Sequence, residues 1–129
     1  CLSAKLEKEL TSLSGEDKGI FLEEYGISCS ALEALTRISY KALGLITFFT
    51  SSEDESRSWM VKEGSKAPQA ARVIHEDMEK GFIRAEVIKF ADIDELGSEK
   101  KVKEAGRYMI KGADYIVEDG DILGILFNV

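Results

Sequence analysis

The hydrophobic pattern changes its period at Gly44, and this change limits the chain to a fold in which a helical part precedes a sheet. Before Gly44, apolar residues recur every three or four positions, which is the period of an α-helix. After it, the apolar run Leu45–Phe49 has the length of a strand and leads into a polar loop. The sequence therefore predicts an α+β protein with two parts, residues 1–44 and residues 45–129.

Residues that begin and end helices divide the first part. Ser14 with Asp17, and Ser30 with Glu33, have the spacing of capping boxes, in which side chains bind the free amides at a helix start. A glycine follows each of the two later helices, where a C-terminal cap is expected. We expect a helical hairpin or short bundle with an inward apolar face made of Leu32, Leu35, Ile38 and Leu43.

The second part alternates strand and helix patterns around the only proline. Two strands are expected at Leu45–Thr50 and Arg57–Val61, joined by the polar loop Ser51–Ser56. Pro68 favours a helix start because its missing N–H costs nothing there, so we expect one long helix over Pro68–Lys80.

Four further strands complete the predicted sheet. Ile83, Ala85 and Val87 alternate with charged residues, which indicates a half-buried strand. Short strands at 107–110 and 115–117 and a terminal strand at 122–127 are expected to follow. This order is typical of a β-grasp fold, in which a mixed sheet packs one face on a single long helix.

Composition excludes several classes of protein. The formal net charge of −7 argues against indiscriminate nucleic-acid binding. No apolar run approaches the roughly 18 residues that a membrane helix needs, and no signal-peptide pattern opens the sequence. Cys1 and Cys29 have neither metal-ligand spacing nor a disulfide framework. We expect a cytoplasmic protein with no membrane partner.

Long strings in the second part resemble one known family. They are FFTSSEDESRSWM, KAPQAARVIHEDMEKGFIRAEV and YIVEDGDIL, followed by the terminal FNV. Together they are similar, almost continuously, to the C-terminal TGS domain of the YchF family of Obg-like P-loop ATPases. The resemblance implies a β-grasp TGS domain. Arg72, Glu76 and Met78 depart from the Gly, Thr and Phe that are usual there, so a family partner surface need not transfer unchanged.

The resemblance also implies that the chain is part of a longer protein. Residues 1–44 are then a helical linker with the end of the nucleotide-binding domain, the start at Cys1 is a truncation, and Val129 is the natural C-terminus. For the full-length protein the resemblance implies a P-loop ATPase that prefers ATP over GTP and uses Mg²⁺. For this chain we expect no catalytic residue and no hydrolysis, because the phosphate cradle, the Mg²⁺ ligands and the water-positioning residue are missing.

The segment Ser3, Ala4 and Lys5 is a candidate contact to the nucleotide base. It resembles the loop after the last strand of P-loop nucleotide-binding domains, where small residues let backbone N–H groups approach the base. A simple strand-to-helix turn explains the three residues equally well.

Basic residues around the expected helix form the candidate partner-binding site. Their charges could meet ribosomal RNA phosphates, or their stems could cover apolar edges with the charged heads in water. These residues are Lys62, Lys66, Arg72, His75, Lys80 and Arg84. Trp59, Phe82 and Tyr108 could stack on RNA bases if they are exposed, although aromatic residues on the strands of small domains more often belong to the core.

His75 is the only histidine, and it is expected to share one helix face with Glu79. A zinc site would need a third and a fourth ligand, and none is evident in the sequence, so we expect no metal. A structural hydrogen bond and a partner contact both remain open for His75.

Two functions of different class follow. In the first, the chain is a binding module that helps a YchF-like ATPase to engage the ribosome, its RNA or an associated protein. In the second, it is an intramolecular brace or lid that packs on the ATPase domain and has no partner of its own.

Overall fold

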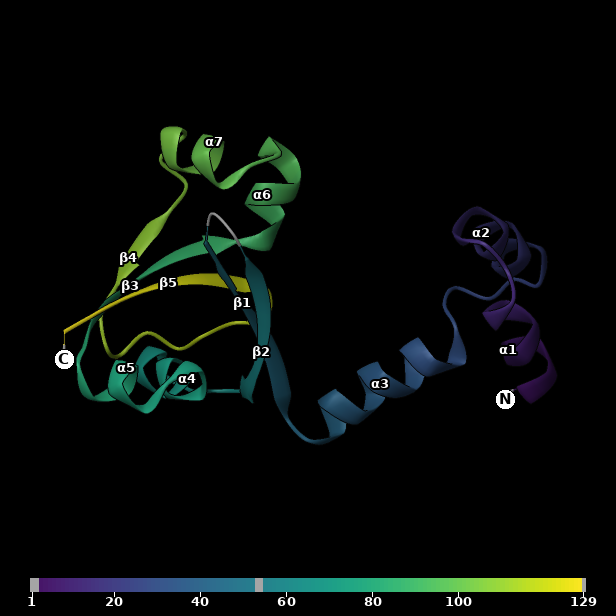
Figure 1. Ribbon diagram of the computed structural model, residues 1–129, viewed down its shortest axis with the longest axis horizontal. Coiled ribbons are helices and arrows are strands. Elements are labelled where there is room, and N and C mark those ends of the chain that lie inside the picture. The colour runs from purple at the N-terminus through teal and green to yellow at the C-terminus, as the bar shows by residue number, and fades with distance from the viewer. Residues whose placement is uncertain (1–2, 53–54, 129) are drawn as a thin grey trace. The chain divides into compact units, whose positions relative to one another are not determined.

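The computed structural model describes residues 3–52 and 55–128, which fall into two compact units, Cys1–Ala42 and Leu43–Val129 (Figure 1). The predictions made for Cys1, for Val129 and for the loop residues Glu53 and Asp54 lie outside the described residues. The predicted α+β class is confirmed.

The described residues of the first unit form three helices, α1 (Ala4–Thr11), α2 (Gly15–Glu24) and α3 (Ala31–Ala42). The predicted caps are present, because Ser14 Oγ accepts a hydrogen bond from the amide of Asp17 at 3.4 Å and Ser30 Oγ accepts one from Glu33 at 3.2 Å. The Oε1 atom of Glu7 in α1 accepts a hydrogen bond from the amide of Ala31 at 2.7 Å, which joins α1 to the first turn of α3.

The predicted inward face of α3 is wrong. Its apolar side chains are mostly exposed, with exposed fractions of 72% for Leu32, 56% for Leu35 and 65% for Ile38, and Leu43 beyond the helix is 66% exposed. The first two helices are short, and the hydrogen bond from Ala31 to Glu7 holds α3 only at its first turn, so these helices leave much of the apolar face of α3 exposed.

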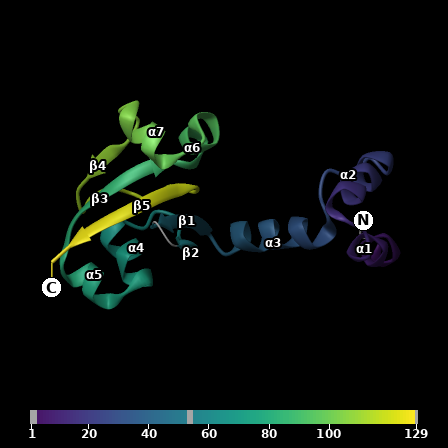
Figure 2. The same cartoon turned by 45° about the horizontal axis from the view of Figure 1, so that its top comes forward.

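The second unit contains a five-stranded mixed sheet with the strand order β2-β1-β5-β3-β4. The first two strands, β1 (Leu45–Ser51) and β2 (Ser56–Lys62), form an antiparallel hairpin. The last strand, β5 (Asp121–Phe127), lies in the centre, parallel to β1 and antiparallel to β3 (Phe82–Lys89) (Figure 2). The short strand β4 (Met109–Lys111) forms the other edge beside β3.

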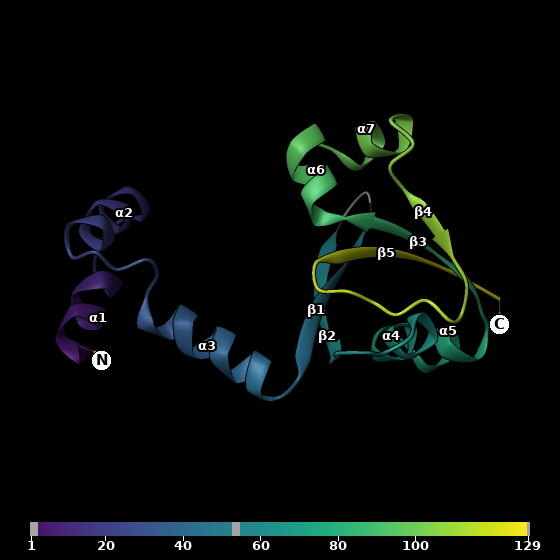
Figure 3. The ribbon, with the colours of Figure 1, turned by 180° about the vertical axis from the view of Figure 1, so that it is seen from behind.

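Helices pack on both faces of this sheet, but they cover them unequally (Figure 3). On one face, α4 (Ala67–Ile74) and the short α5 (Glu76–Lys80) pack over the main core, whose largest buried side chains include Phe48, Val87 and Leu123. This single helical layer on a mixed sheet is the arrangement expected of a β-grasp domain. On the other face, α6 (Phe90–Leu96) and α7 (Glu99–Glu104) cover a smaller cluster around Ile88, Ile122 and Val102.

The long helix predicted over Pro68–Lys80 is in fact two helices that meet at His75. The backbone of His75 is extended, with φ −160° and ψ 141°, and its Nδ1 atom accepts a hydrogen bond from the amide of Asp77 at 3.2 Å. The side chain therefore caps α5 in the way that an N-cap residue does. His75 and Glu79 are consequently not an i, i+4 pair on one continuous helix, which corrects that expectation.

A bulge changes the predicted alternation in β3. The register shifts between Phe82 and Arg84, so Ile83 is an additional residue and is 52% exposed, whereas Ala85 and Val87 are fully buried. An extra residue in one strand moves the neighbouring side chains out of phase, and this explains why Ile83 does not face the core. The strand predicted at 115–117 is reduced to an isolated bridge between Lys66 and Ile116.

Candidate partner-binding surfaces

The structure separates the predicted basic residues into two groups. Four of them belong to the α4–α5 layer: Lys66, Arg72, His75 and Lys80. The other two lie on strands next to core residues, Lys62 beside the buried Val61 and Arg84 beside the buried Ala85. Because successive side chains in a strand point to opposite faces, Lys62 and Arg84 point away from α4. The six residues therefore do not form one site.

The cations of the α4–α5 layer are paired with carboxylates. Lys66 Nζ lies 2.8 Å from Asp114 Oδ1, and this contact holds the pKa of Asp114 below its usual value. The other two pairs are Arg72 with the half-buried Glu79 at 3.5 Å and Lys80 with the exposed Glu76 at 2.9 Å. Exposed ion pairs contribute little free energy, so a phosphate can replace the carboxylate at modest cost.

The start of α4 is already occupied by the chain itself. The amide of Lys66 donates to Gln69 Oε1 at 2.8 Å, and the amide of Ala67 donates to the carbonyl oxygen of Tyr115 at the same distance. These contacts use the N–H groups that a helix start would otherwise offer to an anion. Anion binding on this layer therefore depends on the side chains of its cations.

The candidate nucleotide-base contact lies at the start of α1. Ser3 is the N-cap, and its Oγ accepts a hydrogen bond from the amide of Leu6 at 3.5 Å, while Ala4 and Lys5 form the exposed first turn. This geometry accounts for Ser3 as a helix cap. A nucleotide contact by this segment stays a prediction.

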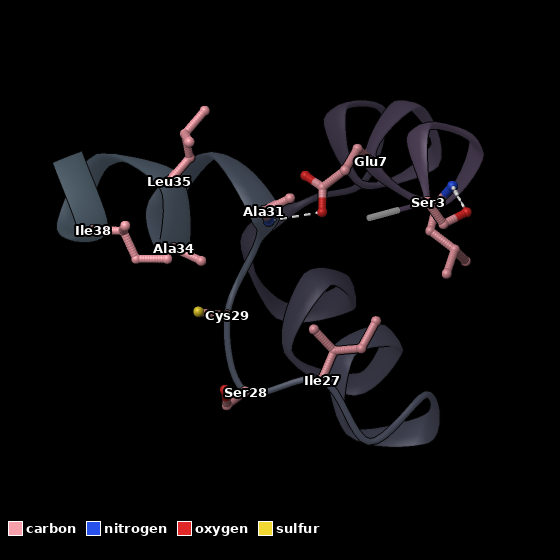
Figure 4. A pocket seen from close by; sticks show the side chains of 10 residues that line it. Ser3, Glu7, Ile27, Ser28, Cys29, Ala31, Ala34, Leu35 and Ile38 are labelled. Carbon is pink, nitrogen blue, oxygen red and sulfur yellow. Dashed lines mark hydrogen bonds between the residues drawn. The ribbon is translucent and has the colours of Figure 1, made fainter. Parts of the chain in front are cut away.

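A pocket of about 400 Å³ lies in the first unit (Figure 4). Apolar side chains from α1, α3 and the segment between α2 and α3 form most of its wall, among them Leu6, Ile27 and Ile38. The carboxylate in its lining, that of Glu7, is bound to the backbone of Ala31, as the dashed line in Figure 4 shows. This lining suits apolar contact rather than acid–base chemistry.

The sequence analysis missed a polar cluster at the end of β3. Lys89 Nζ contacts Asp121 Oδ1 at 2.6 Å, Glu118 Oε2 at 2.8 Å and the Tyr115 hydroxyl at 3.2 Å, and that hydroxyl donates to Asp121 Oδ2 at 2.7 Å. Asp121 is completely buried. The string YIVEDGD carries three of these residues, but nothing in the sequence indicates that Lys89 meets them.

Opposing effects set the protonation of this cluster. Burial opposes the charge of Lys89, but its hydrogen bonds to Asp121, Glu118 and Tyr115 outweigh burial and raise its pKa above the usual value. Burial, followed by the hydrogen bond to Asp121, raises the pKa of Tyr115. The buried polar atoms of the cluster all have hydrogen-bond partners among the described residues, so the cluster ties the loop before β5 to β3.

Most of the candidate stacking rings belong to the core. Trp59 and Phe82 are half-buried against the main cluster, and Trp59 Nε1 donates to Thr50 Oγ1 at 2.9 Å. Tyr108 is 38% exposed. Of the three rings, only Tyr108 keeps a surface that could stack on a base.

Two other classes of site are absent from the described part of the chain. Residues 3–52 and 55–128 contain no group of three or more His, Cys, Asp or Glu side chains that could hold a metal ion. Over the same residues, no helix has both the length and the apolar character that crossing a bilayer requires.

The fold is that of a small α+β domain preceded by a helical segment. Its surfaces suit contact with a partner. A family described as the YchF-type GTPase C-terminal domain, a protein family of unknown function (DUF933), matches residues 45–128. The chain is 48% identical over 126 residues to the ribosome-binding ATPase YchF of Bacillus subtilis and 51% identical over 126 residues to Obg-like ATPase 1 of Gallus gallus, with 98% of this chain covered in each case.

A solved structure shows the same relationship. The YchF GTPase of Schizosaccharomyces pombe superposes with a TM-score of 0.83 at 38% identity and covers 97% of this chain. The chain belongs to the YchF family of Obg-like ATPases, and its fold is that of the family's C-terminal region. It spans about a third of the length of the relatives it matches, with 34% of the Bacillus protein and 32% of the Gallus protein covered.

Proposed function

We propose that this chain is a binding module of a YchF-like ATPase and that it helps to attach that protein to the ribosome. The observation that carries the proposal is the similarity, across 98% of the chain, to proteins named ribosome-binding ATPase YchF in Bacillus subtilis and Haemophilus influenzae. A role on ribosomes of this kind would place the protein in the cytoplasm.

The α4–α5 layer is the surface we propose for ribosomal RNA. Lys66, Arg72 and Lys80 are exposed there, and each is held by a weak surface ion pair. When an RNA phosphate replaces the carboxylate partner of one of these cations, the counterions of that phosphate are released. This release favours binding at low salt. The net charge of −7 would confine such binding to this local surface.

The test is co-sedimentation of the 129-residue chain with purified ribosomal subunits over a series of salt concentrations. The double variant Lys66→Glu/Arg72→Glu should bind more weakly, and the slope of log K against log salt should fall by about two, because two phosphate contacts are lost. The double variant Lys18→Glu/Lys41→Glu makes the same total charge change at exposed positions of α2 and α3 and is the matched control. Equal binding by the double variant and the wild type would show that the interface does not include these cations of α4.

A second function is supported by the exposed apolar face of α3. Leu32, Leu35 and Ile38 are more than half exposed, and such side chains suit a surface that packs on another domain. The chain would then act as a brace on an upstream ATPase domain, where ATP or GTP with Mg²⁺ would bind and where Ser3, Ala4 and Lys5 would approach the base. The test of this brace function compares the ATP affinity and turnover of an isolated ATPase domain with and without this chain. Unchanged values would exclude the brace.

A further inference from the structure

The sheet face opposite α4 is covered only in part, and its uncovered part forms a second surface. On this face α6 and α7 cover Ile88 and Ile122. Beyond them, exposed residues of β3, β4 and β5 are not covered by any other element in the described part of the second unit. We call the following five residues the open-sheet surface: Ile83, Arg84, Ile110, Gly124 and Leu126.

Strand pairing brings these residues together. Arg84 lies directly opposite Leu126, and Ile110 lies opposite Glu86, two residues further along β3 on the same face. Side chains in such direct and diagonal positions are close enough to contact one partner at once. Gly124, also opposite Glu86, contributes no side chain, so the backbone of the central strand is open at this point.

The open-sheet surface combines aliphatic side chains with a cation. Ile83, Ile110 and Leu126 have exposed fractions of 52%, 54% and 47%. Among residues 3–52 and 55–128, Arg84 makes no ion pair with a carboxylate. The acid nearest along β3, Glu86, is already bound by Lys103 Nζ at 3.2 Å, and Lys103 also lies 3.3 Å from Glu99.

These properties favour a protein partner over RNA. A surface that binds RNA offers several phosphate contacts or aromatic rings for stacking, and the five residues offer one cation and no ring, with Tyr108 the single ring next to β4. An arginine surrounded by aliphatic side chains is instead typical of the centre of protein interfaces. The surface lacks a carboxylate that can accept the hydrogen bonds of the Arg84 guanidinium, and a protein partner would supply it.

We propose that the open-sheet surface docks an acidic protein segment of the ribosome, in which aliphatic residues flank a carboxylate that pairs with Arg84. This inference rests on the proposed attachment to the ribosome and names a second contact, on the face opposite the RNA-contacting layer. The segment lies across β3 and β5, with its aliphatic side chains on Leu126 and Ile110 and its backbone over Gly124.

Site-specific photo-crosslinking tests the class of the partner. A benzophenone amino acid replaces Leu126 in the 129-residue chain, which is irradiated with purified ribosomal subunits, and the adducts are identified by mass spectrometry. The same amino acid at Met60 is the control, because Met60 is 48% exposed on β2 at the sheet's far edge. The expected adduct is an acidic peptide of a ribosomal protein, formed from position 126 and not from position 60.

Three variants test the geometry. Arg84→Glu places a like charge opposite the segment and should lower the adduct yield by about fivefold or more. Gly124→Ala should lower it by obstruction while the sheet stays folded, because a Cβ at Gly124 would meet Glu86 Cβ at 3.6 Å, an ordinary contact. Lys62→Glu makes the same charge change at the end of β2 and should leave the yield within about twofold.

The outcomes separate the inference from the proposed function. Ribosome binding with adducts to ribosomal RNA, or with a yield unchanged by Arg84→Glu, would overturn the inference alone. Ribosome binding without any adduct from position 126 would do the same. Absence of ribosome binding by the wild-type chain would overturn the proposed function and this inference together.

Discussion

At the scale of single residues, the buried Asp121 connects several parts of the second unit through its hydrogen bonds. Its two carboxylate oxygens accept hydrogen bonds from Lys89, from the Tyr115 hydroxyl and from the amide of Glu118. A fully buried carboxylate is costly unless it is paired and hydrogen-bonded, and here both conditions are met. The loop that leads into the central strand is therefore fixed by one side chain.

This cluster makes stability sensitive to alkaline pH. The pKa of Tyr115 is raised in the folded chain, so on raising the pH the unfolded chain loses this proton first. The stabilisation is complete below the ordinary tyrosine pKa of about 10 and is lost as the pH rises towards the folded value. The raised pKa of Lys89 likewise contributes stability that is lost as the pH rises.

We therefore expect the free energy of unfolding to fall less steeply above a pH of about 10 in Tyr115→Phe than in the wild type. Urea denaturation at a series of pH values measures these slopes. Tyr108→Phe, a substitution outside the cluster, is the control and should follow the wild type. Parallel curves for Tyr115→Phe and the wild type would contradict the role assigned to the cluster.

At the scale of elements, the end of α5 depends on a close approach between backbones. The amide of Asn128 donates to the carbonyl oxygen of Gly81 at 2.9 Å, and a Cβ at Gly81 would lie 1.9 Å from the carbonyl oxygen of Asn128. Because the obstructing atom belongs to the backbone, the conflict cannot be relieved by a rotamer change. The glycine is needed for space, since its φ of −95° is open to other residues.

Gly81→Ala should consequently destabilise the chain by about 1–3 kcal/mol, the usual cost of overpacking. Gly112→Ala is the matched control, because nothing lies within 4 Å of a Cβ at that position. The midpoint of urea denaturation reports the difference. A midpoint for Gly81→Ala equal to that of Gly112→Ala would show that the end of β5 moves aside.

Sequence patterns predicted the strands well and the helix on the sheet only in part. Regular apolar alternation and the capping residues located β1, β2, β5 and the caps of α2 and α3, because these signals are local. The break at His75 was missed because a histidine that caps a helix through Nδ1 has no distinct spacing. The bulge at Ile83 depends on pairing with β5, which lies about forty residues away in sequence.

The candidate site was less predictable than the fold for the same reason. The basic residues were chosen for their nearness in sequence to the expected helix, yet the face of Arg84 is decided by its register with Leu126. Whether a cation has a carboxylate partner also depends on tertiary contacts, as the pair of Lys66 with Asp114 illustrates. The grouping of Arg84 with Leu126 and Ile110 could be read only from the sheet.

At the scale of the whole molecule, the division into two units has a measurable consequence. The main core residues, among them Phe48, Val87 and Leu123, all belong to the unit Leu43–Val129. We expect residues 43–129 alone to fold with a melting temperature within about 3 °C of that of the corresponding transition in the full chain. Calorimetry of both chains measures this. An unfolded or strongly destabilised shorter chain would show that the first unit stabilises the sheet.

The central position of β5 also fixes the order in which the protein can form during its own synthesis. The β1–β2 hairpin and the β3–β4 pair are joined across the sheet by β5, whose contact between Phe49 and Ile122 spans most of the unit. Until Phe127 has been translated and has left the exit tunnel, the two half-sheets have no strand between them. The nascent chain therefore emerges with its core open and completes it late, through contacts of high sequence separation that close slowly.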